Sequence, residues 1–335
     1  MSAGGRQPGA LAIIGPTATG KTALALRVAR AVNGEIISAD SRQAYRGLEI
    51  GTAAPSLAER ASVPHHGVAF LEPGERYGAG RFSRLCRQWI ADIQARGRTP
   101  VVVGGTGLFL RGLIQPVFAE PDLDEERRTA LEVWLGDRSI EDLRRWTGRL
   151  DPALGRRLPV IDRQRAGRAL EMALLSGRSL TWWQAHAPPE AEPLEIRIWA
   201  LDCEPDEHRR RIAARARSML GDGWVREVEA LAAAGHGPDS PAMTSIGYVD
   251  VWRFSTGEIS REEALEAIVR DTWQYARRQR TWIRHQLPAE TLRADALSET
   301  GLLAARIAKD WRCCGPDRTE ETDRKSSNNR RAGGR

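Results

Sequence analysis

The segment from Leu11 to Val32 restricts the fold more than any other part of the sequence. Its apolar run meets Gly15-Pro-Thr-Ala-Thr-Gly-Lys-Thr22, which matches the pattern G-x-x-x-x-G-K-[ST], and Ala- and Leu-rich sequence follows. This order predicts a strand, a loop and a helix. In such a loop backbone N–H groups wrap a phosphate chain at the helix N-terminus, Lys21 places a point charge on its oxygens, and the Thr22 hydroxyl can ligate Mg²⁺. The predicted phosphate-binding residues are Gly15, Pro16, Thr17, Ala18, Thr19, Gly20, Lys21 and Thr22.

The distribution of lysine argues against a chance match. Because the chain has 32 glycines, the pattern G-x-x-x-x-G alone is common. Lysine, however, fills only three of the 50 basic positions, and Lys21 is the only one before residue 309. Arginine is used almost everywhere else, so a lysine is kept where a compact charge fits phosphate and a planar guanidinium does not. The pattern predicts phosphate or diphosphate binding without fixing the reaction.

Two further strand-like runs end in polar loops. Glu35 to Ala39 ends at Asp40, and Pro100 to Val103 runs into Gly104-Gly-Thr-Gly107. Glu195 to Leu201 alternates again, which indicates a return to the same sheet. Strands that alternate with helices predict a parallel sheet whose ligands gather beyond the carboxyl ends of the strands. The predicted fold class is therefore α/β, a P-loop NTPase-like parallel sheet with flanking helices.

From about Gln115 to Pro193 the β-branched residues typical of strands disappear. Charged, Leu- and Ala-rich segments broken by Gly and Pro predict several short helices there, which we interpret as a helical insertion. The end of the chain is rich in Asp, Arg, Ser, Asn and Gly and is predicted to be disordered. The predicted boundaries are a discontinuous P-loop core over 9–116 and 195–312, a helical insertion domain over 117–194 and a disordered tail over 313–335.

Composition excludes several classes of protein. With 335 residues, 41% hydrophobic and 28% charged, the chain is globular rather than disordered or fibrous. No apolar run approaches about 18 residues and no signal pattern opens the sequence, so we expect a soluble cytoplasmic protein without membrane contact. The four cysteines are too few and too irregularly spaced for a disulfide framework or a zinc site. We further expect a monomer.

Asp40 is the carboxylate expected to face the phosphate loop. The strand that ends at Val103 offers no acid, although phosphoryl-transfer proteins usually hold Mg²⁺ through an acid at the end of a strand. Because Asp40 falls at the same edge of the sheet, a role as general base or in metal binding is plausible. A helix N-cap or a turn residue is the structural alternative, and spacing alone leaves both open.

The net charge of +6 permits a polyanionic partner without requiring one. Basic residues are concentrated in segments 156–168 and 270–284, each with five arginines against one aspartate. In the second segment one helical face is predicted to pack and another to meet phosphates. The packing residues are Ile268, Tyr275 and Trp282, and the arginines at helical spacing are Arg270, Arg277, Arg280 and Arg284. A solvated surface would explain either segment alone, but two of them beside a phosphate loop favour an RNA channel.

Several motifs occur in the order found in one enzyme family. Over roughly residues 10–290 the chain resembles the bacterial tRNA dimethylallyltransferases, which prenylate N6 of the adenosine immediately 3′ of the anticodon. Only the phosphate loop is diagnostic alone, whereas the ordered set is specific. Trp273 stands where the family commonly has Arg, and we expect it to pack between helices. The motifs after the loop are Asp40-Ser-Arg-Gln-Ala-Tyr45, Ile50-Gly-Thr-Ala53, Pro64-His-His66, Val103-Gly-Gly-Thr-Gly-Leu108, Asp162-Arg-Gln-Arg165 with Arg168-Ala-Leu-Glu171, Ser245-Ile-Gly-Tyr248 and Gln274-Tyr-Ala-Arg-Arg-Gln-Arg-Thr-Trp282.

The resemblance implies that the loop holds the diphosphate of dimethylallyl diphosphate rather than ATP, with Mg²⁺ as cofactor. Neutralising the diphosphate makes it a better leaving group as the C–O bond breaks. The family's Asp that matches Asp40 contacts the exocyclic amine of the flipped adenine and is the candidate base. By this resemblance the catalytic residues are Asp40, Thr19 and Thr106, and Arg211 and Arg215 extend the diphosphate site.

The resemblance also implies contacts with the anticodon arm of tRNA, from which the target base is extruded into the enzyme. Ser41 to Gln43 match the segment that meets the flipped base, and residues of the insertion match an RNA-contacting segment. For Arg128 a solvated charge is the alternative, since neighbouring Arg127 leaves the helix register open. The expected tRNA-binding residues are Asp40, Ser41, Arg42, Gln43, Thr106, Arg128, Gln164, Arg165, Ala166, Gly167, Arg168, Arg277 and Arg278.

Two other functions are alternatives. An isopentenyltransferase acting on free adenine nucleotides would share the phosphate loop and the Asp chemistry, but a mononucleotide needs neither the long insertion nor the Arg-rich helices. An RNA-binding nucleotide switch would hold ATP or GTP in the loop and use Asp40 only to order Mg²⁺. Tight binding of nucleoside triphosphates would favour the switch, whereas competition by diphosphates without hydrolysis would favour the transferase.

Overall fold

The computed structural model describes residues 9–158, 160–238, 240–294 and 299–313. It divides the chain into two compact units, one formed by Gln115–Pro193 and the other by the residues before and after that segment. The predicted tail over 313–335 lies outside the described residues except for Cys313. That cysteine is the last residue of a helix and is therefore not part of a tail.

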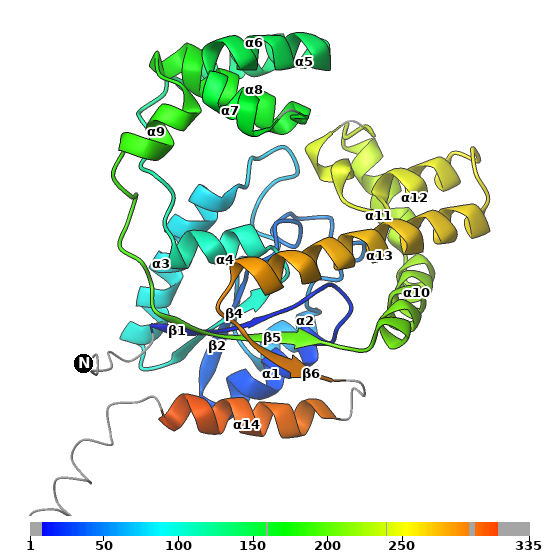
Figure 1. Ribbon diagram of the computed structural model, residues 1–335. Helices are drawn as coiled ribbons and strands as arrows, with labels where there is room; N and C mark the ends of the chain where they lie inside the picture. Colours follow the sequence, from blue (N-terminus) through cyan, green and yellow to red (C-terminus); the bar gives the residue numbers. More distant parts are fainter. Residues whose placement is uncertain (1–8, 159, 239, 295–298, 314–335) are drawn as a thin grey trace, which may run out of the picture. The chain divides into compact units, whose positions relative to one another are not determined.

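The described residues of the first unit form a six-stranded sheet in which all neighbouring strands are parallel (Figure 1). The order is β3-β2-β4-β1-β5-β6, so β1 lies between β4 and β5. The four strands predicted from sequence are confirmed to within one residue at each end, whereas β3 and β6 were not predicted. The strands are β1 (Ala10–Ile14), β2 (Gly34–Ser38), β3 (His65–His66), β4 (Thr99–Gly104), β5 (Ile196–Asp202) and β6 (Glu290–Arg293).

Helices cover both faces of this sheet, which is why the central strands are continuous apolar runs. Leu11, Ile13 and Val101 pack on one face, and Ala12 and Val102 pack on the other. The first face is covered by α1 (Lys21–Ala31) and α14 (Thr300–Cys313), and the second by α3 (Ala79–Ala95), α4 (Gly107–Ile114) and α13 (Arg261–Gln286) (Figure 1).

A third apolar cluster surrounds Trp224 and Tyr248. Ile268 in the first half of α13 belongs to this cluster, whereas Ile283 in the second half packs against the sheet, so α13 connects the two. Like the other described helices, α13 lacks the apolar length needed to span a bilayer. The remaining helices of this unit are α2 (Leu57–Ser62), α10 (Pro205–Gly221), α11 (Trp224–Ala233), the 3₁₀ helix η1 (Pro241–Thr244) and α12 (Tyr248–Ser255).

The second unit is helical, and each of its helices begins at an Asp or Ser whose side chain accepts a hydrogen bond from a backbone N–H group. Leu135, Leu143, Leu154 and Leu170 form its own apolar core. The helices are α5 (Glu125–Gly136), α6 (Ile140–Leu150), α7 (Pro152–Arg157), α8 (Arg163–Ser176) and α9 (Leu180–His186), and the N-caps are Asp124, Ser139, Asp151, Asp162 and Ser179.

The chain enters and leaves the second unit along paired segments. Within this unit Glu190 N–H donates to the Val117 carbonyl oxygen at 2.8 Å. Within the first unit Leu194 N–H donates to the Leu113 carbonyl oxygen at 2.9 Å. The backbone of the first unit is therefore continuous in space across the point where the second unit is inserted.

Candidate active site

A cavity of about 380 Å³ lies at the carboxyl ends of β1, β2 and β4. This is the edge at which a parallel α/β sheet binds ligands. Loop residues that follow these strands supply its polar side, while α10, α11 and α13 supply apolar side chains that include Met219, Trp224 and Ile268. The cavity therefore offers a polar region and an apolar region to one ligand.

The phosphate loop takes a shape that depends on its glycines. Gly15 has a φ of 155°, and a Cβ at this position would lie 2.3 Å from the Leu201 carbonyl oxygen, so the loop can approach β5 only with glycine here. Gly20 is the N-cap of α1 and has no side chain to accept hydrogen bonds, which leaves the first N–H groups of α1 to a ligand. The loop residues that line the cavity are Thr17, Ala18, Lys21 and Thr22.

Two cations converge on the cavity. The Lys21 ammonium donates to the Pro16 carbonyl oxygen at 2.6 Å, and Arg215 of α10 forms no hydrogen bond or ion pair within the part of the chain that the structure describes. Burial, together with the charge of Arg215, lowers the pKa of Lys21 to about 7. Burial also lowers the pKa of the Arg215 guanidinium. Because a bound anion would favour the charged form of both groups, the site is suited to a ligand with several negative charges.

Asp40 combines the two interpretations left open by the sequence. Its Oδ1 accepts hydrogen bonds from the N–H groups of Arg42 at 2.8 Å and Gln43 at 3.3 Å, so it orders the turn that follows β2. The residue also lines the cavity, and its charge offsets part of the lowering that burial imposes on the pKa of both Lys21 and Arg215. The turn thus holds a carboxylate against the cations of the phosphate site.

Thr106 and Gln43 fasten this turn to its neighbours. The Thr106 hydroxyl oxygen accepts a hydrogen bond from Ser41 N–H at 3.2 Å. The Gln43 amide nitrogen lies 3.3 Å from the Thr52 carbonyl oxygen and 3.1 Å from that of Ala53, and it donates to them. Ser41, Arg42 and Gln43 all line the cavity. In this structure Thr106 and Gln43 hold the cavity wall in shape.

Gln279 is a residue of the site that sequence reasoning missed. Its side-chain oxygen accepts from Thr17 N–H at 2.9 Å, and its amide nitrogen donates to the Gly105 carbonyl oxygen at 2.9 Å. It therefore joins the phosphate loop to the loop after β4. The available signal was an amide at helical spacing from the apolar residues Ala276 and Ile283, and the structure shows that all three side chains are buried.

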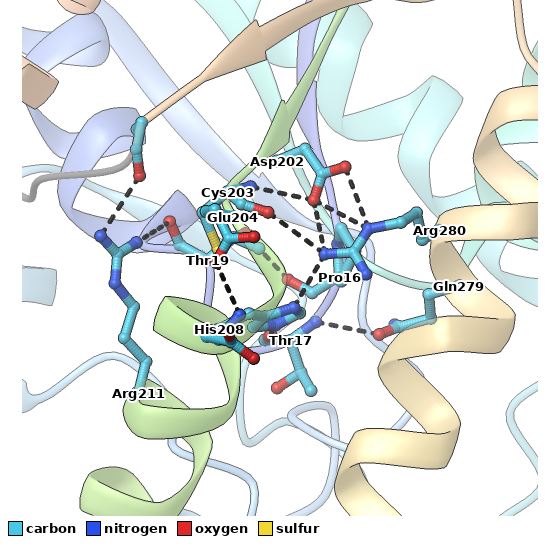
Figure 2. A network of polar contacts seen from close by, with 12 residues as sticks. Pro16, Thr17, Thr19, Asp202, Cys203, Glu204, His208, Arg211, Gln279 and Arg280 are labelled. Carbon is cyan, nitrogen blue, oxygen red and sulfur yellow. Dashed lines mark hydrogen bonds and ion pairs between the residues drawn. The ribbon is translucent and has the colours of Figure 1, made fainter.

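The side chains of Thr19 and Arg211 do not face the cavity, although both were expected to contact diphosphate. Thr19 is fully buried, and its hydroxyl donates to the Pro16 carbonyl oxygen at 2.9 Å, so its side chain does not line the cavity. Arg211 contacts Glu207 and the carbonyl oxygen of Ala294. It also contacts the carbonyl oxygen of Thr19 (Figure 2). Their expected side-chain contacts with diphosphate are not supported by this geometry, because both support the loop from outside the cavity.

The basic face of α13 is only partly available. Arg280, expected to face phosphates, is held by Asp202 with an Nη2–Oδ1 distance of 2.8 Å, and 18% of its side chain is exposed. Its position on the helix was predicted, but its partner on β5 was not. Arg277 and Arg278 line an open hollow on the surface of α13, and Arg278 also lines the cavity. Together with the exposed Arg284, these two arginines are the cations of α13 that the structure leaves for a polyanion.

In the second unit the expected RNA contacts are of two kinds. Arg128 and Arg168 are both paired with Glu171, and Arg168 is also paired with Glu120, so either arginine would have to exchange a partner to meet a phosphate. Ala166 is fully buried in the core of the unit, which contradicts a contact through its side chain. Gln164 and Arg165 are exposed and Gly167 is half-buried on α8. Arg165 has an exposed ion pair with Asp162 at 3.5 Å, and contacts of Gln164 and Arg165 with RNA stay a prediction.

Glu227 of α11 is a second missed residue, and it holds one wall of the cavity. Its carboxylate accepts hydrogen bonds from Ile50 N–H at 2.7 Å, Gly51 N–H at 2.9 Å and the Tyr248 hydroxyl at 2.7 Å. Burial raises the pKa of this carboxyl. The Ile50-Gly51 and Gly247-Tyr248 motifs, about 200 residues apart in sequence, are therefore joined through one side chain.

Substituting Gly51 with Ala should lower the free energy of unfolding by about 1–3 kcal/mol, the usual cost of overpacking. A Cβ at Gly51 would lie 2.1 Å from Trp224 Nε1 and 2.5 Å from the Tyr248 hydroxyl, both in the buried cluster. Urea unfolding of the variant and of a Gly74→Ala control, where a Cβ would meet nothing within 4 Å, measures the difference. Equal unfolding midpoints for the two would show that Trp224 can move without cost.

Comparison with known proteins identifies the family. The model of the family described as IPP transferase matches residues 43–286, and that described as isopentenyl transferase matches residues 8–64. The tRNA dimethylallyltransferase of Thermomicrobium roseum is 40% identical over 84% of this chain and 84% of its own length. That of Anaeromyxobacter dehalogenans is 42% identical over 82% of this chain and 91% of its own.

Solved structures agree with these matches. The tRNA isopentenylpyrophosphate transferase of Bacillus halodurans superposes with a TM-score of 0.64 at 30% identity, over 91% of this chain and 97% of its own. A eukaryotic dimethylallyltransferase that acts on tRNA superposes with a TM-score of 0.74 at 25% identity, over 89% of this chain and 77% of its own. On the family model that covers residues 43–286 and the relatives that are 40–42% identical over more than four fifths of the chain, this chain belongs to the IPP transferase family.

Proposed function

We infer that this protein is a tRNA dimethylallyltransferase, which transfers the dimethylallyl group of dimethylallyl diphosphate to N6 of the adenosine immediately 3′ of the anticodon, position 37, and releases diphosphate. Relatives with this activity are about 40% identical over most of the chain. The structural observation that carries the proposal is a cationic phosphate loop and an apolar wall within one cavity. A five-carbon prenyl diphosphate has the same two parts.

The proposed binding mode follows from the two regions of the cavity. The diphosphate would lie at the N-terminus of α1, where the N–H groups of the loop, Lys21 and Arg215 can neutralise it. The dimethylallyl group would lie against Met219, Trp224 and Ile268. A nucleoside triphosphate would instead place a polar ribose against part of this apolar wall, which disfavours it.

In the proposed reaction the adenine N6 atom forms a bond to C1 of the dimethylallyl group as the C1–O bond to diphosphate breaks. The electron pair of that bond leaves with the diphosphate, whose developing charge Lys21 and Arg215 stabilise. The N6 proton passes to the Asp40 carboxylate. N6 is a poor nucleophile because its lone pair is delocalised, so its orientation and the removal of its proton should limit the rate.

Mg²⁺ fits the residues around the loop. Thr22 lines the cavity next to Lys21, at the sequence position whose hydroxyl ligates Mg²⁺ in phosphate loops. Diphosphate oxygens and water would complete its coordination, since Mg²⁺ usually keeps several waters. When bound, the ion would supply further neutralisation of the leaving group.

Replacing Arg277 by Glu should weaken tRNA binding about tenfold and reduce its salt dependence, because a protein cation that meets a phosphate releases counterions. Arg277 lies in the open hollow of α13 and has no ion pair with another residue placed by the structure. The slope of log Kd against log salt concentration should fall by about 0.7–0.9 for each phosphate that the protein no longer neutralises. Fluorescence anisotropy over a salt series measures it.

The matched control for this variant is Arg270→Glu, which makes the same charge change on the same helix. Arg270 is already paired with its neighbour Asp271 at 2.9 Å. Its substitution should change tRNA affinity less. Identical salt slopes for the two variants would remove Arg277 from the RNA interface.

Incubation with unmodified tRNA and isotope-labelled dimethylallyl diphosphate, followed by nucleoside analysis, tests the proposed function. Label is expected in the nucleoside of position 37, and a tRNA with another base at that position is the control. Label in free adenine nucleotides instead of tRNA would identify the enzyme that acts on mononucleotides. Hydrolysis of ATP without prenyl transfer would support the nucleotide switch.

A further inference from the structure

Both backbone polar groups of Thr17, in the middle of the phosphate loop, are bound to distant helices (Figure 2). The Thr17 N–H donates to Gln279 of α13, and the Thr17 carbonyl oxygen lies 2.7 Å from His208 Nε2 of α10. The loop is therefore fixed from two directions. Its backbone conformation at Thr17 depends on side chains outside the phosphate-binding motif.

The contacts of His208 determine which ring nitrogen carries the proton. Arg280 Nη2 lies 3.0 Å from His208 Nδ1. A guanidinium can only donate hydrogen bonds, so Nδ1 must accept and carries no proton. The proton of the neutral ring is then on Nε2, which donates it to the Thr17 carbonyl oxygen. This arrangement requires an uncharged imidazole in its Nε2–H form.

Asp202, at the end of β5, sets the orientation of Arg280. Arg280 Nε lies 3.0 Å from each of the two carboxylate oxygens, and its Nη2 lies 2.8 Å from Oδ1. The two side chains are 18% and 22% exposed. A two-point ion pair that is mostly removed from water holds the guanidinium in one plane. A line of contacts thus runs from Asp202 through Arg280 and His208 to Thr17.

The surroundings of His208 oppose its protonation. The residue is fully buried, and burial is the largest cause that lowers its pKa from the ordinary value of 6.5. The ring of Trp273, which was expected to pack between helices, lies edge-on to the imidazole with 5.6 Å between ring centroids. Two cations near His208, Arg280 of α13 and Lys21 of α1, disfavour the imidazolium, whereas the carboxylate of Asp202 on β5 favours it. On the same helix as His208, Glu207 is paired with Arg210 and Arg211.

We propose that His208 is a positioning residue of the phosphate loop, and that the loop holds the diphosphate of the substrate only while this imidazole is uncharged. The proposal rests on the proposed function for the identity of the ligand. A proton on Nδ1 would place an N–H group against the Arg280 guanidinium, so the ring would have to turn and release the Thr17 carbonyl oxygen. The N–H groups of the following residues would then lose their common direction.

Affinity for diphosphate should therefore fall as the pH is lowered. Because burial lowers the pKa of His208, the imidazole stays neutral through the neutral pH range and gains a proton only in acid. The same sign applies to folding, since the unfolded chain would bind this proton more readily than the folded chain. Both effects disappear in a variant whose residue 208 does not titrate.

The test uses inorganic pyrophosphate as the probe and the variants His208→Gln and His208→Leu. The glutamine amide can donate to the Thr17 carbonyl oxygen without titrating, whereas leucine removes the donor. At about pH 7.5 we expect wild-type affinity for the Gln variant and about tenfold weaker binding for the Leu variant. In kinetics the KM for dimethylallyl diphosphate should rise in the Leu variant while kcat at saturation changes less.

The pH dependence distinguishes positioning from a structural role. Protonation of pyrophosphate affects all proteins equally, so the ratio of the wild-type Kd to that of His208→Gln reports residue 208 alone. This ratio should rise about threefold or more from about pH 7.5 to about pH 5. His65→Gln is the matched control, since His65 is a half-buried histidine on β3 whose pKa burial also lowers. The ratio of the wild-type Kd to that of this control should stay constant.

A wild-type-to-Gln ratio that does not change with pH would overturn the proposal, as would a folded Leu variant that binds pyrophosphate like the wild type. Nitrogen-15 NMR of the wild-type ring gives a measurement that does not depend on the folding of variants, and a protonated Nδ1 at neutral pH would also overturn it. Failure of the wild-type protein to bind pyrophosphate would instead contradict the proposed function, whereas normal binding with a flat ratio contradicts only the role of His208.

Discussion

Replacing Asp40 by Asn should lower kcat for dimethylallyl transfer by about 10²- to 10⁴-fold, the range associated with loss of a general base. The amide oxygen of Asn can still accept from the N–H groups of Arg42 and Gln43, so the turn after β2 should keep its shape. Affinity for dimethylallyl diphosphate should fall little, because the phosphate loop is untouched. Single-turnover kinetics with saturating tRNA, together with calorimetry of diphosphate binding, measures both quantities.

The comparison with Asp40→Ala separates the two roles of this side chain. Alanine removes both the base and the acceptor that orders the turn, so it should also reduce thermal stability and weaken tRNA binding through Ser41 to Gln43. If the Asn variant turned over at the wild-type rate, Asp40 would not be the base. If the Ala and Asn variants had the same thermal stability and the same affinity for tRNA, the hydrogen bonds of the turn would contribute nothing measurable to either.

Replacing Lys21 by Met should lower kcat/KM for dimethylallyl diphosphate by about 10²- to 10³-fold, as expected when one group that stabilises developing negative charge is removed. Lys21 lies beside Arg215 with part of its surface buried, so its loss leaves one cation for a multiply charged leaving group. Lys21→Arg is the control, because it keeps the charge but replaces a point charge with a planar fork. Restoration of full activity in that variant would contradict the assigned need for a compact charge.

The pKa of Lys21 adds a pH dependence that can be measured separately. In the free protein this pKa is lowered to about 7, and a bound diphosphate should raise it again. Above pH 7 the protein must therefore take up a proton as it binds diphosphate, and affinity should decline as the pH rises. Calorimetry at about pH 8 in two buffers of different ionisation enthalpy should give an uptake of about one proton for the wild type and none for Lys21→Arg. Equal uptake in both proteins would place the titration elsewhere.

The sequence predicted those parts of the fold that depend on local patterns. β1 and β4 are continuous apolar runs because both of their faces are covered, and their adjoining Gly-rich loops mark where they end. β3 has two residues, and β6 has the sequence Glu-Thr-Leu-Arg at the edge of the sheet, so neither carries a periodicity that could be recognised. Their pairing is decided by contacts distant in sequence.

The difference between local patterns and contacts distant in sequence also explains which residues of the site could be predicted. The phosphate loop and Asp40 could be predicted because each lies in one short segment next to a strand end. Gln279 and Glu227 could not, since each bridges backbone groups more than 170 residues away and the local sequence does not show which backbone groups an amide or a carboxylate will meet. Helical spacing placed Arg280 among the arginines that face solvent. Spacing predicts the side of the helix on which a residue lies, but it does not predict that Asp202 of β5 would pair with Arg280 there.

The hydrogen bond between Leu194 N–H and the Leu113 carbonyl oxygen has a consequence for how such a chain can change in evolution. The two points where the helical unit departs and returns are neighbours in the backbone of the first unit, so a short turn could close the gap if the intervening residues were removed. The length and helix content of that unit can therefore vary without rerouting any strand of the sheet. Proteins built on this plan can therefore differ in the surface that the helical unit presents, while the cavity and its cations stay unchanged.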